Sequence, residues 1–93
     1  MKIELSNFTG QPCKSRMAYE FLPNKEYSLN LEKTANALRE QEVFIELESD
    51  YLLMLKMQGH DISLFRSGKI IVKAINDKEK ARNIAQNLVK KLG

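Results

Sequence analysis

A chain of 93 residues is short for two domains but long enough to build one hydrophobic core, so a single domain spanning residues 1–93 is expected. Hydrophobic residues make up 43% of the chain and charged residues 29%, a balance that excludes an intrinsically disordered protein. The net charge of +3 is unevenly spread, with seven basic and two acidic residues in the range 69–93 and five acidic and no basic residues from Glu40 to Asp50.

The first 22 residues are interpreted as a strand and loop extension. Met17 to Leu22 fit a strand, whereas Thr9 to Ser15 have the composition of a loop. The first seven residues lack the apolar core of a signal peptide, and the single cysteine, Cys13, cannot form an internal disulfide. Because no apolar run is long enough to cross a bilayer either, we expect a cytoplasmic protein without a membrane partner.

Two helices are expected from apolar residues that recur at helical spacing. The first begins after Ser28 or Asn30, either of which can cap a helix, and carries Leu31, Ala35 and Leu38 on one face. The second closes the chain and has a longer apolar stripe, which packs against the rest of the domain. The members of this stripe are Ala81, Ile84, Ala85, Leu88, Val89 and Leu92.

Between the helices, alternating hydrophobicity predicts four strands. Two short segments that contain glycine, 58–61 and 66–69, have the character of hairpin turns and favour an antiparallel meander. The predicted fold class is therefore α+β, a curved antiparallel β-sheet with two helices packed on one face. The expected strands are residues 43–48, 51–57, 62–65 and 70–73.

A sheet with both helices on one side leaves its other face uncovered. Alternation places Phe65 on the face opposite to Ile62 and Leu64, so Phe65 is expected to be exposed while the other two are buried. Two readings of the uncovered face stay open: it binds a partner, or residues 1–22 or a second subunit cover it. The hydrophobic residues expected there are Tyr51, Leu53, Leu55, Met57, Phe65 and Ile71.

Local sequence adds a resemblance to a known family. The segment from Ser63 to Val72 resembles the hairpin Leu-Ile-Phe-x-Ser-Gly-Lys-hydrophobic-Val of the TATA-binding-protein family. Asn30 to Thr34 with Ala37-Leu38 resembles the start of that family's first helix, and Val89 to Gly93 is similar to the close of its repeat. The resemblance covers about residues 29–93 and implies one half-repeat of the family's saddle-shaped fold.

In that family the concave sheet face lies in the minor groove of DNA, and aromatic wedges unstack base steps. The resemblance implies that Phe65 matches one wedge and that Tyr51 falls near the other. It also implies that Lys69 meets DNA, with Ile71 and Lys73 facing it nearby. A full saddle needs two repeats, so the resemblance implies a homodimer of this chain.

Two functions are expected for a domain of this kind, and both are forms of binding. One is nucleic-acid binding through the uncovered sheet face of a dimer. The other is protein–protein interaction through the same apolar face, with the acidic segment, defined as residues 40–50, selecting a basic partner. The family has basic residues where this chain has acidic ones before Tyr51, and acidic residues repel a phosphate backbone. The candidate binding residues are Tyr51, Leu53, Leu55, Phe65, Lys69, Ile71 and Lys73.

No pattern of catalytic, metal-binding or cofactor-binding residues is recognised. His60 lies in a predicted turn and has no nucleophile at a telling spacing, and Cys13 has no partner base. No glycine loop for phosphate, zinc-ligand spacing or catalytic triad is present. We therefore expect a non-enzymatic module without a metal or cofactor.

Overall fold

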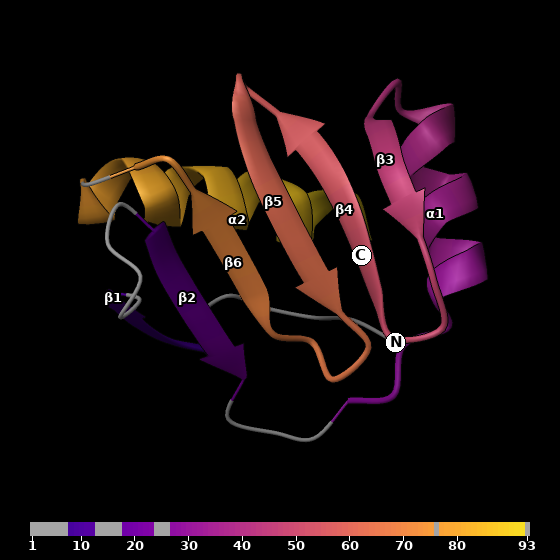
Figure 1. The fold of residues 1–93 in the computed structure, drawn as a ribbon, viewed down its shortest axis with the longest axis horizontal. Helices are drawn as coiled ribbons and strands as arrows, with labels where there is room; N and C mark the ends of the chain where they lie inside the picture. Colours follow the sequence, from indigo (N-terminus) through magenta and orange to yellow (C-terminus); the bar gives the residue numbers. More distant parts are fainter. Residues whose placement is uncertain (1–7, 13–17, 24–26, 76, 93) are drawn as a thin grey trace.

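The structure is a computed structural model and describes residues 8–12, 18–23, 27–75 and 77–92. The described residues form six strands and two helices (Figure 1). In chain order these elements are β1 (Phe8–Pro12), β2 (Ala18–Pro23), α1 (Leu31–Glu40), β3 (Phe44–Glu48), β4 (Leu52–Met57), β5 (His60–Phe65), β6 (Ile70–Lys73) and α2 (Lys78–Leu92).

All strands pair antiparallel in one sheet, in the order β1-β2-β6-β5-β4-β3. Strands β3 to β6 form the expected meander, and β2 pairs with β6, so two strands far apart in the sequence lie side by side. Both helices lie on the far face of the curved sheet in Figure 1, with α2 behind the central strands and α1 behind β3. The predicted α+β class, a curved antiparallel sheet with helices on one face, is confirmed.

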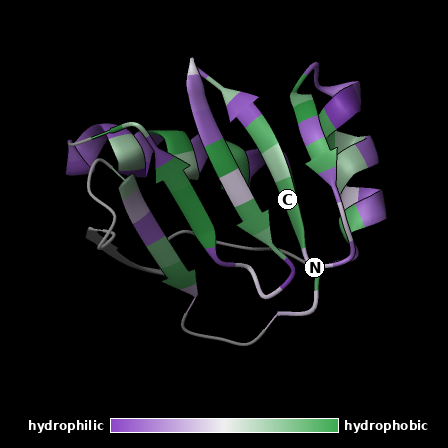
Figure 2. Cartoon of the chain, viewed as in Figure 1, coloured by the Kyte–Doolittle hydropathy of each residue, from purple (hydrophilic) through white to green (hydrophobic). Residues whose placement is uncertain are grey.

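The core lies between this sheet and the helices. Hydrophobic residues run through β4, β5 and β6, whereas both helices mix hydrophobic and hydrophilic residues along their length (Figure 2). Leu31, Ala35 and Leu38 are buried on α1, as their spacing predicted. On α2 the predicted stripe is buried as far as Val89, and Leu92 is half-buried. Neither of these helices, within the described residues, is long and apolar enough to cross a membrane.

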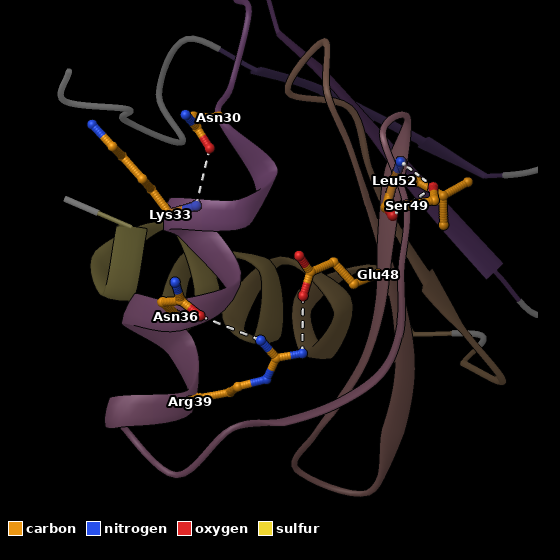
Figure 3. A network of polar contacts seen from close by, with 7 residues as sticks. All are labelled: Asn30, Lys33, Asn36, Arg39, Glu48, Ser49 and Leu52. Carbon is orange, nitrogen blue, oxygen red and sulfur yellow. Dashed lines mark hydrogen bonds and ion pairs between the residues drawn. The ribbon is translucent and has the colours of Figure 1, made fainter.

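The start of α1 is fixed by Asn30. Its Oδ1 accepts the backbone N–H of Lys33 at 3.0 Å (Figure 3). The carbonyl oxygen of Asn30 also accepts the hydroxyl of Thr34 at 2.8 Å. Of the two caps that the sequence allowed, Asn30 is therefore the one used. Asp77 does the same for α2, because its Oδ1 accepts the N–H groups of Glu79 and Lys80.

Removing the Asn30 cap of α1 should destabilise the folded protein measurably. We expect Asn30→Ala to lower the free energy of unfolding by about 1 kcal/mol, because the N–H of Lys33 loses its acceptor. Asn36→Ala is the matched control, since Asn36 is exposed in the middle of α1 and its Oδ1 is 3.4 Å from Arg39. Urea denaturation measures both variants. Equal losses would contradict a capping role for Asn30.

Two local predictions were wrong. Residues 9–12, expected in a loop, belong to β1, which pairs with β2; residues 13–15 of that predicted loop, with Cys13, lie outside the described residues. Gly10 and Pro12 disfavour strands in general, but β1 is an edge strand, where such residues are tolerated. The first hairpin turn is also tighter than expected. Only Gln58 and Gly59, with φ of 53° and 79°, form it, and His60 begins β5.

Strand β3 departs from simple alternation. Its register with β4 shifts between Ile45 and Leu47, so Glu46 is an extra residue that forms a β-bulge. The bulge moves Leu47 to the face opposite the helices and turns Glu48 toward α1. There the carboxylate of Glu48 forms an ion pair with Arg39 at 3.0 Å (Figure 3).

Candidate binding surface on the open sheet face

The sheet face opposite the helices, called the open face below, has no described element packed on it (Figure 1). Directly paired residues on antiparallel strands share a face, so the register defines this surface. The exposed large hydrophobic residues on its strands are Phe44 and Leu47, which are 61% and 48% exposed. Paired residues on the open face include Phe44 with Lys56, Leu47 with Met54, Leu52 with Phe65, Met54 with Ser63, Lys56 with Asp61, Ser63 with Ile71, Glu20 with Ile71, and Ala18 with Lys73.

Two candidate binding residues are not on this surface. Leu53 and Leu55 are fully buried at 0% exposure on the helix side of β4, and Met57, expected beside them, is buried there too. The prediction that these residues face a partner was wrong. Because β4 is apolar on both sides, alternation alone did not identify its buried face. Lys56, the charged residue in this strand, marks the open face and was the available signal.

The predicted facing of Phe65, opposite to Ile62 and Leu64, is confirmed, although its side chain is half-buried and not fully exposed. Ile62 and Leu64 are buried at 1% and 0% exposure, whereas Phe65 is half-buried on the open face. The Nζ of Lys69 lies 4.8 Å from the centroid of the Phe65 ring, within the range of a cation–π interaction. The β5–β6 turn therefore joins an aromatic ring and a cation on one surface.

Tyr51 is brought to the same end of the sheet by backbone contacts. It lies in the β3–β4 turn, is 75% exposed, and its carbonyl oxygen accepts the N–H of Arg66 at 2.8 Å. The hydroxyl of Ser49 accepts the N–H groups of Tyr51 and Leu52, which holds the turn closed. A pocket of about 350 Å³ lies between the two turns. It is lined by Tyr27, Ser28, Tyr51, Phe65, Arg66 and Ser67.

Ile71 and Lys73 lie on β6 and share the open face with Phe65, as expected. Lys73 is at the opposite end of the sheet from the Tyr51 turn, because β6 ends with this residue. There the Nδ1 of His60 is 3.2 Å from the carbonyl oxygen of Lys73. His60 is thus half-buried in a strand, where its ring contacts the neighbouring backbone.

The open face contains residues that sequence reasoning did not include. Its centre is aliphatic, with half-buried Leu52 and Met54 between Leu47 and Phe65. Leu47 was missed because the bulge at Glu46 moves it to the open face. Phe44 lies before the bulge and faces outward by simple alternation, but it was not included among the candidates. Charges surround this centre. The basic residues are Lys56, Lys69 and Lys73, and the acidic residues are Asp61 and Glu20. The Nζ of Lys56 lies 3.8 Å from Oδ1 of Asp61.

A second cleft of about 620 Å³ adjoins the Tyr51 turn on the side of α1. Glu32, Glu48 and Asp50 line it together with Arg66 and several hydroxyl and amide groups. Within the part of the chain that the structure describes, no group of three or more His, Cys, Asp or Glu residues is placed to hold a metal ion. Because charged and polar groups line this cleft, it differs from the aromatic pocket beside it.

No protein-family model, no curated protein and no solved structure matches the chain. The resemblance to the TATA-binding-protein family therefore stays a prediction, and the functional assignment depends on the open face itself.

Proposed function

We propose that this domain is a non-enzymatic binding module that contacts nucleic acid through its open face. The observation that carries the proposal is the grouping of Phe65, Lys69 and exposed Tyr51 at one end of a face without helices. A base stacked on an aromatic side chain contributes about 1–3 kcal/mol, and a neighbouring cation attracts the phosphate. Phe65 and Tyr51 are the proposed stacking residues.

Lysines support the same proposal along the rest of the face. Lys69 and Lys73 lie on or beside β6, and Lys56 lies across the sheet on β4. In this proposal they meet phosphates, so affinity falls steeply as salt rises. The element order from β2 to α2 fits one half-repeat of a TATA-binding-protein-like saddle, and two copies acting as a homodimer complete the surface. The single cysteine supports a reducing compartment such as the cytoplasm.

A second candidate function is binding of a protein partner. The aliphatic centre of the open face favours it, because Leu47, Leu52 and Met54 offer apolar area without a hydrogen-bonding group for a base. In this alternative the acidic segment, residues 40–50, selects a partner with basic residues. A pulldown at moderate salt separates the two functions, according to whether nucleic acid or one discrete protein is recovered.

The test of the first function is a double substitution on the open face. We expect Phe65→Ala with Lys73→Glu to weaken binding of a fluorescently labelled oligonucleotide at least about tenfold, since one stacking surface and one cation are lost. Fluorescence anisotropy at low salt measures the affinity, with single-stranded and duplex probes compared. Lys80→Glu is the matched control, because it makes the same charge change on exposed α2.

Phe65 is half-buried, so a fold check accompanies this test. Circular dichroism compares the variants, and Lys69→Glu alone is a second variant that leaves the Phe65 ring in place. Unchanged affinity in both open-face variants, or no binding of any probe by the unmodified protein at low salt, would remove nucleic acid as the ligand.

A further inference from the structure

Within the described part of the chain, the outer edge of the sheet at β3 has no strand beside it. Strand β3 ends the described sheet, and none of the described strands pairs with its outer side. Four of its five residues are exposed, among them Phe44 and Leu47. Edge strands present backbone N–H and C=O groups that another extended chain can pair with. This edge is therefore suited to accept one more strand.

Acidic side chains concentrate around the same edge. Glu46 lies in β3, Glu40 and Glu42 lie just before it, and Asp50 lies just after it, all of them exposed. Among the described residues, none of these four carboxylates forms an ion pair, whereas Glu48 is paired with Arg39. Carboxylates without an ion-pair partner favour a positively charged strand at this edge.

A second copy of this chain is a poor occupant of the edge. Antiparallel pairing of β3 with its own copy about the central residue sets Glu46 directly opposite Glu46 of the copy. Like charges in directly opposed positions destabilise a strand pair. The occupant that fits the charge is a different, basic chain.

We propose that the outer edge of β3 binds an extended peptide in which basic residues alternate with apolar ones. Backbone hydrogen bonds to β3 supply affinity, and alternate side chains supply specificity. The apolar residues lie on the open-face side, next to Phe44 and Leu47, and the basic residues meet the carboxylates around Glu46. This proposal rests on the second candidate function in its use of the acidic segment, but it places the partner at the edge of the sheet.

The test uses a labelled synthetic peptide of alternating lysine and valine, about six residues long, which is a common strand length. We expect it to bind in a fluorescence anisotropy titration at low salt. A peptide of alternating glutamate and valine should not bind. Neither should the lysine–valine peptide with every backbone nitrogen methylated, because it keeps its charge and donates no backbone hydrogen bond.

Variants of the chain locate the contact. Glu46→Gln should weaken peptide binding about threefold, the size of one exposed ion pair, whereas Gln86→Lys, which makes the same charge change on exposed α2, should have a smaller effect. Amide hydrogen exchange should slow in residues 44–48 when the peptide is bound.

Three other results would each overturn the proposal, and each has a different meaning. Equal binding of the fully methylated peptide would mean attraction by charge alone, without an added strand. Protection at residues 65–73 in place of 44–48 would put the peptide on the open face, which keeps the second candidate function and removes the edge. Absence of binding at low salt would remove the edge site while leaving nucleic-acid binding by the open face untouched.

Discussion

Replacing Leu55 by alanine should lower the free energy of unfolding by about 3 kcal/mol, because the substitution leaves a cavity between the sheet and its helices. Leu55 has 0% exposure and lies in the core with Ile62 across the strand pair. Leu47→Ala is the matched control, since it removes the same atoms from a side chain that is 48% exposed. That variant should lose less than about 1 kcal/mol.

Urea denaturation with a common slope for the two variants measures this difference. The comparison tests directly which face of the sheet is buried, because Leu55 lies on the helix side and Leu47 lies on the open face. Similar losses for Leu55→Ala and Leu47→Ala would mean that the open face is covered in solution, by a partner or by another part of the chain. The proposed binding functions would then lose the surface on which they depend.

The same pair of leucines explains how far the sequence predicts this fold. Helical spacing identified the buried faces of both helices, because polar residues interrupt their apolar stripes at a clear period. Strand β4 has no such contrast, so its facing was assigned wrongly for Leu53 and Leu55. In β3 the alternation of inward and outward residues is interrupted at Glu46, and no local sequence pattern predicts this extra residue.

The candidate site was predictable in part. Alternation alone placed Phe65 on the open face, and the family resemblance named Tyr51 and Lys69 as its neighbours in function. Tertiary hydrogen bonds bring the turns that contain these residues together. The carbonyl oxygen of Tyr51 accepts the N–H of Arg66, and the carbonyl oxygen of Arg66 accepts the N–H of Leu29. These contacts link three segments far apart in the chain, so no short sequence pattern contains them.

Gly68 controls the turn that presents this site, and its replacement by alanine should cost about 3 kcal/mol, from backbone strain together with overpacking. Its φ is 97°, a backbone conformation that residues with a Cβ rarely adopt. Its N–H donates to the carbonyl oxygen of Phe65 at 2.9 Å. An added Cβ would also lie 2.9 Å from Cδ2 of Tyr27 and 3.4 Å from Cγ of Pro23. Both effects act on a buried position.

Gly59→Ala separates the two contributions. Gly59 also has positive φ, at 79°, but an added Cβ there meets no atom within 4 Å. We expect it to lose only the strain component, about 1 kcal/mol, in thermal or urea unfolding. If both glycine variants lose the same amount, Tyr27 yields to the new methyl group and the turn is not held by close packing. A larger loss at Gly68 would mean that the ring of Tyr27 fixes the turn from which Phe65 and Lys69 reach the open face.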